Sequence, residues 1–66
     1  MSISLAPPAI QSGKIKSFGA FGPKYEICRM LHQLADGDWM VSIKMVDSGE
    51  MTEYRLSRMT SDPDAL

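Results

Sequence analysis

The chain is poor in the residue types that give small proteins covalent cross-links or metal chemistry. Its 66 residues include one cysteine and one histidine. An internal disulfide is therefore impossible, and Cys28 and His32 cannot form a metal site alone. A single unpaired thiol is typical of a reducing compartment, so we expect a cytoplasmic protein without a metal or cofactor.

The chain also lacks a strong charge of either sign and a long apolar run. Its formal net charge is −1, whereas a dedicated nucleic-acid binder usually has a basic excess. No run approaches the roughly 18 apolar residues of a membrane-spanning helix, and the N-terminal residues lack the basic and apolar regions of a secretory signal. We expect no membrane association, and we rank another protein above nucleic acid as the partner.

Catalytic motifs are missing as well. The phosphate-binding Gly-x-x-x-x-Gly-Lys, the His-Glu-x-x-His and the nucleophile-elbow patterns do not occur. Gly19 and Gly22 have the Gly-x-x-Gly spacing of a nucleic-acid clamp, but Phe21 is apolar and Pro23 removes an amide. We interpret this stretch as a glycine loop, with Phe18 and Phe21 as core side chains beneath it, and expect no enzyme activity.

The strongest positive signal is an alternating apolar run over residues 39–46, which lies between two turns, Asp36-Gly37 and Ser48-Gly49. Asp-Gly between apolar segments is a hairpin signal, so the pattern predicts an antiparallel β-meander.

Two-residue loops would set the register of this meander. Leu34 would face Trp39, His32 would face Val41 and Met30 would face Ile43, while Tyr54 would face Ile43 and Leu56 would face Val41. One face of the sheet would then collect Cys28, Met30, Leu34, Trp39, Val41, Ile43, Met45, Tyr54 and Leu56. Trp39 and Tyr54 are thus expected in the core rather than as stacking platforms for bases.

Residues 24–35 allow a second interpretation, because Ile27, Met30, Leu31 and Leu34 also have helical spacing. The one-sided apolar face of the meander favours the strand, so we expect an all-β fold. This fold is a small antiparallel meander of three to four strands that curls toward an SH3-like open barrel. The alternative is an α+β fold with residues 24–35 helical against a β-hairpin. Closure of the barrel would come from Phe18, Phe21 and the N-terminal segment, or from a homodimer.

The chain divides into three expected parts. Residues 1–12 are a flexible lead because Pro7-Pro8 blocks helix and strand alike. Residues 13–60 form one small β domain, which includes a short strand near residues 14–18. Residues 61–66 are a polar tail that we expect to be flexible.

Four stretches of the chain also resemble a family of short bacterial proteins known only as a domain of unknown function. They are Lys16-Ser-Phe-Gly-Ala-Phe-Gly-Pro-Lys-Tyr-Glu-Ile27, Asp47-Ser-Gly-Glu50, Glu53-Tyr54 and Asp62-Pro63-Asp64-Ala65. The resemblance implies an extended segment after Tyr25-Glu26. In the family that segment often carries glycine or proline, which this chain lacks over residues 28–35, so the helical alternative stays open. The family supplies no known activity.

Cys28 and His32 are the candidates for a catalytic thiol–imidazole pair. On a strand, Cys28 and His32 would be about 13 Å apart, beyond hydrogen-bond reach, whereas on a helix they could touch.

The candidate binding residues are Arg29, Lys44 and Arg55, which fall on the second face of the predicted sheet. In the predicted register Arg29 faces Lys44, a repulsion that a negatively charged partner would relieve. We expect a non-enzymatic protein-interaction module of a bacterial operon, of an antitoxin-like or accessory kind. The alternative is a small-barrel nucleic-acid-binding protein that uses this basic face.

Overall fold

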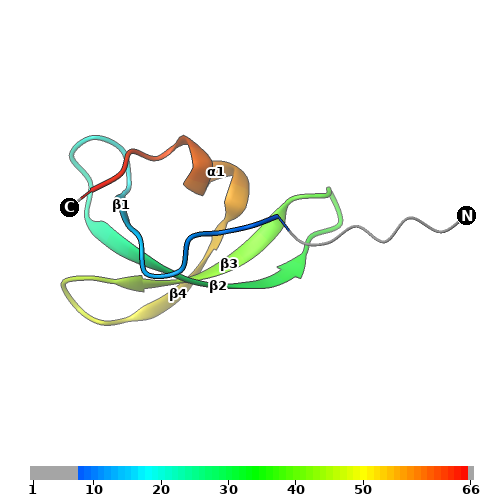
Figure 1. The fold of residues 1–66 in the computed structure, drawn as a ribbon, viewed down its shortest axis with the longest axis horizontal. Helices are drawn as coiled ribbons and strands as arrows, with labels where there is room; N and C mark the ends of the chain where they lie inside the picture. Colours follow the sequence, from blue (N-terminus) through cyan, green and yellow to red (C-terminus); the bar gives the residue numbers. More distant parts are fainter. Residues whose placement is uncertain (1–7, 66) are drawn as a thin grey trace, which may run out of the picture.

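A computed structural model describes residues 8–65 as a curled four-stranded antiparallel sheet with one short helix (Figure 1). The strands pair in chain order and are β1 Ile15–Ser17, β2 Lys24–Gln33, β3 Trp39–Met45 and β4 Met51–Arg55. Helix α1, Leu56–Ser61, follows β4 directly. The antiparallel meander is confirmed, and the helical alternative for residues 24–35 is wrong because Lys24–Gln33 form the strand β2. The helix α1 is an addition that the sequence analysis did not anticipate.

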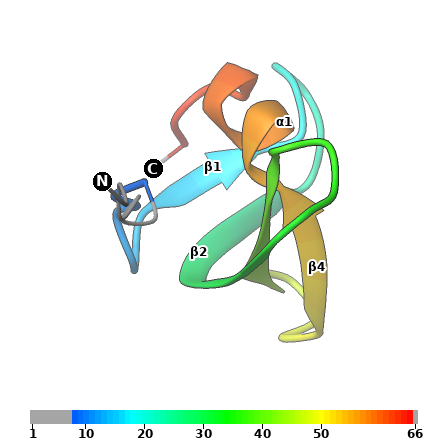
Figure 2. The same cartoon turned by 90° about the vertical axis from the view of Figure 1, so that its right-hand side faces the viewer.

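The core lies on the concave side of the sheet. Its buried apolar residues are Tyr25, Ile27, Val41, Ile43 and Met59. Met59 belongs to α1, which covers the opening between β4 and the chain end near β1 (Figure 2). The helix thus shields an apolar face that a curled sheet of this size leaves open to water.

The first hairpin has a longer loop than the predicted one. The amide of Leu34 donates to the carbonyl of Asp38 at 2.7 Å, and the amide of Gly37 donates to Leu34 at 3.0 Å. Gly37 has a φ of +91°, so the connection is a three-residue loop that ends in a left-handed glycine. Trp39 therefore pairs with Gln33 instead of Leu34.

The second hairpin also differs, by two residues. The amide of Met45 donates to Glu50 and the amide of Gly49 donates to Met45, each at 2.8 Å, which closes a four-residue loop. Ile43 now pairs with Thr52, and Val41 pairs with Tyr54. A shift by two preserves the faces of a strand, so Val41 and Ile43 are buried as predicted.

Two irregularities in β2 change which of its residues reach the core. The ladder with β3 shifts between Ile27 and Arg29, and again between Met30 and His32. The extra residue at Cys28 inverts the alternation. Tyr25 and Ile27, which were not predicted as core residues, are therefore buried, and Met30 packs against the core.

Three residues of the predicted apolar face lie outside this core. Cys28, Leu34 and Trp39 are half-buried and do not belong to the core cluster. Cys28 is displaced by the irregularity in β2, and Leu34 and Trp39 lie at the loop end of the first hairpin. Met45, Tyr54 and Leu56 do pack against the core.

Both ends of the described chain are held to the sheet. Ile10 packs against the core, and the hydroxyl of Ser12 donates to the carbonyl of Cys28 at 2.7 Å. Residues 1–7 of the expected flexible lead lie outside the described residues. In the expected flexible tail, Asp64 forms a β-bridge with Lys16, and the amide of Ala65 donates to Ile15 at 2.9 Å. The chain thus places its own C-terminal segment along β1.

Candidate functional site

The residues of the predicted basic face have different cross-strand neighbours in the structure. Arg29 pairs with Ser42, and Ser42 pairs with Glu53, so a cation and a carboxylate occupy the same row. Lys44 pairs with Glu26 on one side and with Met51 on the other. The expected repulsion between Arg29 and Lys44 is therefore wrong, and the face carries charges of both signs.

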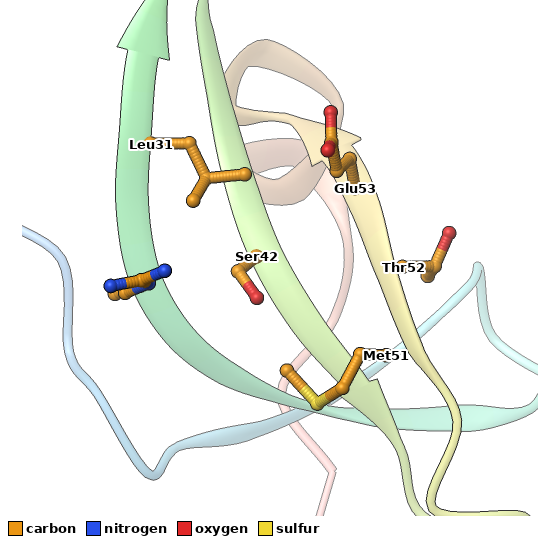
Figure 3. A pocket seen from close by; sticks show the side chains of 6 residues that line it. Leu31, Ser42, Met51, Thr52 and Glu53 are labelled. Carbon is orange, nitrogen blue, oxygen red and sulfur yellow. The ribbon is translucent and has the colours of Figure 1, made fainter.

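A shallow open hollow lies on this outer face, lined by Arg29, Leu31, Ser42, Met51, Thr52 and Glu53 (Figure 3). Arg29, Lys44 and Glu53 form no ion pair or side-chain hydrogen bond within residues 8–65. Their charged groups are thus available to a ligand.

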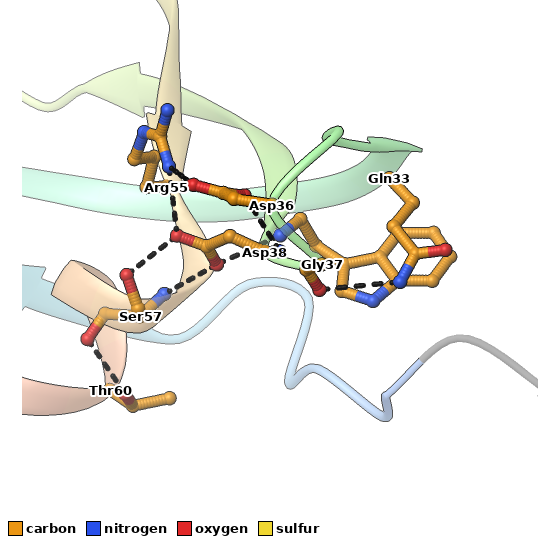
Figure 4. A network of polar contacts seen from close by, with 8 residues as sticks. Gln33, Asp36, Gly37, Asp38, Arg55, Ser57 and Thr60 are labelled. Atoms are coloured by element: carbon orange, nitrogen blue, oxygen red, sulfur yellow. Dashed lines mark hydrogen bonds and ion pairs between the residues drawn. The ribbon is translucent and has the colours of Figure 1, made fainter.

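Arg55 is separated from the other two candidates by an ion-pair network. Its guanidinium contacts Asp36 at 2.7 Å and Asp38 at 3.5 Å (Figure 4). The hydroxyl of Ser57 donates to Asp38 at 2.6 Å, and the amide of Ser57 donates to the same carboxylate at 3.2 Å. Asp38 therefore caps the first turn of α1, where Arg55 at the N-cap position offers no side-chain acceptor. The network is structural, so the structure does not bring Arg55 together with Arg29 and Lys44 as a cationic site.

The same network lowers the pKa of both carboxyl groups. The hydrogen bond from Arg55 is the main cause for Asp36. For Asp38, the main cause of the lowered pKa is the hydrogen bond from Ser57, followed by that from the Trp39 amide. These hydrogen bonds stabilise the charged carboxylates.

Cys28 and His32, the candidates for a catalytic pair, lie on β2 with Arg29 to Leu31 between them. The thiol of Cys28 is 3.7 Å from the carbonyl of Glu26, and His32 is exposed. Among the described residues, histidine, cysteine and carboxylate side chains form no group of three that could hold a metal ion. Nor does any helix in residues 8–65 have the length and apolar character needed to cross a membrane.

The loop between β1 and β2 carries an aromatic residue that the sequence analysis placed in the core. Phe21 is 101% exposed, so this expectation is wrong for Phe21. It holds for Phe18, whose ring lies 4.6 Å from that of Tyr25 and 4.9 Å from that of Tyr54, measured between centroids.

Hydrogen bonds and glycine geometry fix the conformation of this loop. The amide of Phe18 donates to Pro23 at 3.0 Å, and Gly19 has a φ of +72°. Gly22 has no room for a side chain, because a Cβ there would overlap the carbonyl oxygen of Phe18. Phe21 is thus presented by a loop with a defined backbone.

Asp62 connects this loop to the sheet and to the chain end. The hydroxyls of Tyr25 and Tyr54 donate to its Oδ2 atom at 2.7 and 2.9 Å, and the amide of Gly19 lies 3.4 Å from Oδ1. Burial, followed by the hydrogen bond to Asp62, raises the pKa of both tyrosines. Nearby, the ammonium groups of Lys14 and Lys16 form ion pairs with the carboxylate of Asp64.

Two comparisons with known proteins agree with the motif resemblance. The sequence profile of a family of unknown function, DUF5397, matches residues 4–66. An uncharacterised protein from Haemophilus influenzae is 45% identical over 56 residues, which cover 85% of this chain and 89% of that protein. The chain therefore belongs to the DUF5397 family of unknown function.

Proposed function

We propose that this protein is a non-enzymatic protein-interaction module in which Phe21 is the main contact residue. The observation that carries the proposal is the full exposure of this ring on a loop of fixed conformation. A large aromatic side chain gains roughly 1.5–3 kcal/mol when it leaves water. The folded chain leaves the ring of Phe21 in water, so this free energy is gained only when the ring enters a pocket of a partner.

The fixed loop favours a protein as the partner. Because Gly19, Gly22 and the bond from Phe18 to Pro23 define the backbone before binding, little ordering entropy would be lost. Aromatic anchors of this kind are typical contact residues of protein–protein interfaces.

We infer that the module is an antitoxin-like or accessory protein of a bacterial operon. We place it in the cytoplasm, because its one thiol is free and such thiols are typical of reducing compartments. The nucleic-acid alternative has less support. Glu26 pairs with Lys44, Glu53 lies in the same row as Arg29 with Ser42 between them, and Arg55 is engaged by Asp36 and Asp38.

The test compares three tagged proteins in affinity capture from lysate of the source bacterium: the parent, Phe21→Ser and the neighbouring control Ala20→Ser. We expect a partner that the parent and Ala20→Ser retain and Phe21→Ser loses. With the purified partner, Phe21→Ser should weaken affinity tenfold or more. Equal binding by Phe21→Ser, or no protein enriched over a tag-only control, would refute the proposal.

A further inference from the structure

The two outer edges of the sheet differ in whether the chain itself occupies them. Beside β1, the C-terminal segment forms the bridge between Lys16 and Asp64 and the bond from Ala65 to Ile15. β4 pairs with β3, and no other strand of residues 8–65 lies along its second edge. An open edge presents amides and carbonyls that can pair with another chain.

The hairpin geometry identifies the backbone groups that face outward from β4. The Met45 amide donates to the Glu50 carbonyl, which makes this a hydrogen-bonded position of the ladder. Bonded and non-bonded pairs alternate in an antiparallel ladder. The Lys44–Met51, Ser42–Glu53 and Met40–Arg55 pairs are therefore non-bonded. The amides and carbonyls of Met51 and Glu53 and the amide of Arg55 consequently point away from β3, whereas the Arg55 carbonyl, at the N-cap of α1, accepts the first bond of the helix.

The side chains of the same three residues lie on the outer face and differ in availability. Met51 is 54% exposed. Glu53 is exposed and has no cationic partner in the described part of the chain. Arg55 is already engaged by Asp36 and Asp38. The edge therefore offers an apolar contact at Met51 and a negative charge at Glu53.

A second copy of the chain does not match this edge in the register centred on Glu53. Two-fold antiparallel pairing of β4 with itself, centred on Glu53, sets the two Glu53 carboxylates opposite each other. Like charges in that position are destabilising, and a charged residue in mid-edge is a common protection against self-pairing.

We propose that the β4 edge binds an extended segment of a different protein as an added strand. That segment carries a basic residue opposite Glu53 and an apolar residue opposite Met51. In antiparallel addition the basic residue precedes the apolar residue by two positions, and in parallel addition it follows by two positions. Backbone pairing supplies affinity and the two side chains supply selectivity, as in other strand-addition complexes.

Synthetic peptides test this inference directly, and it is independent of Phe21. The probe is blocked Thr-Thr-Lys-Thr-Val-Thr-Thr, and the control peptide has glutamate in place of lysine. We expect amide NMR shifts and slower amide exchange at Met51, Glu53 and Arg55, with the lysine peptide preferred about threefold or more. Phe21→Ser should bind the peptides like the parent, so failure of this proposal is distinguishable from failure of the Phe21 proposal.

Three variants at Glu53 distinguish the contribution of backbone pairing to peptide binding from the contribution of the Glu53 charge. Glu53→Gln should remove the preference between the peptides, and Glu53→Lys should reverse it. Glu53→Pro removes an outward amide that the fold does not use, so the chain should stay folded and lose peptide binding. Equal binding of the two peptides by the parent, unchanged selectivity in Glu53→Lys, or shifts confined to other strands would overturn the inference.

Discussion

Phe18 and Phe21 show how strongly the environment of one residue type differs within a single loop. The ring of Phe18 contacts Tyr25 and Tyr54 inside the curled sheet. Phe21, three positions later, lies on the far side of the glycine turn and is fully exposed. Composition alone assigns both rings to the core, because the side on which each ring falls depends on the backbone angles of the loop.

We therefore expect opposite effects of substitution at these two positions. Phe18→Ala should lower the free energy of unfolding by about 3–5 kcal/mol, since it empties a packed aromatic site. Phe21→Ser should change it by no more than about 0.5 kcal/mol. Urea denaturation monitored by the fluorescence of Trp39 measures both. Equal destabilisation by the two variants would place Phe21 in the core.

The glycines of the chain are required for two different reasons, which a pair of alanine variants separates. A Cβ on Gly13, where φ is +91°, meets no described atom within 4 Å. Gly13→Ala should therefore cost about 1–2 kcal/mol, from the left-handed conformation alone. Gly22→Ala should cost more, because the Cβ would overlap Phe18 and the loop backbone must move. Urea denaturation of both variants tests this order, and a smaller cost for Gly22→Ala would contradict it.

At the scale of elements, the sequence predicts strands better than their connections. The alternation of residues 39–46 identified β3, and the two glycines located both hairpins. Loop length depends on which residue adopts the left-handed conformation, and the irregularity at Cys28 has no signature in an apolar run. The core face of β2 and the exposed Phe21 were therefore beyond prediction, as was α1, whose capping residue Asp38 lies far away in the chain.

That distant cap makes the stability of α1 depend on the first hairpin loop. Asp38→Ala should lower the melting temperature at neutral pH, because Arg55 and Ser57 lose their shared carboxylate. Asp47→Ala is the matched control, since Asp47 lies in the other hairpin loop and its carboxylate forms no hydrogen bond or ion pair with a described residue. Equal melting temperatures of the two variants would show that the cap does not stabilise α1.

The same network gives a pH dependence with a definite sign. The pKa values of Asp36 and Asp38 are lowered in the folded state. Their contribution is therefore complete above the unfolded value of about 3.9 and is lost as pH falls through the folded values. Thermal melts below pH 4 should show a weaker acid dependence for Asp38→Ala than for the parent.

At the scale of the whole molecule, the last few described residues connect parts that are distant in the chain. Asp62 accepts both tyrosine hydroxyls, the Ser17 amide donates to Pro63 at 3.1 Å, and Ala65 donates to Ile15. These contacts join the β1–β2 loop, the sheet and α1 without a closed barrel. They also occupy the outer edge of β1. Among the described strands, β4 therefore has the unpaired outer edge.

Removal of residues 62–66 should therefore abolish cooperative thermal unfolding or lower the melting temperature strongly. The buried Tyr25 and the half-buried Tyr54 would lose their acceptor, and a buried hydroxyl left without one costs about 1–3 kcal/mol. That is a large share of the few kcal/mol that stabilise so small a domain. Asp64→Ala is the control, because it removes only the ion pairs that the exposed Asp64 carboxylate forms with Lys14 and Lys16 and should cost at most about 1 kcal/mol. Sedimentation should also show self-association of the shortened chain, since the freed β1 edge can pair with another copy. A shortened chain that melts like the parent and stays monomeric would show that the sheet needs no closure from its C-terminal segment.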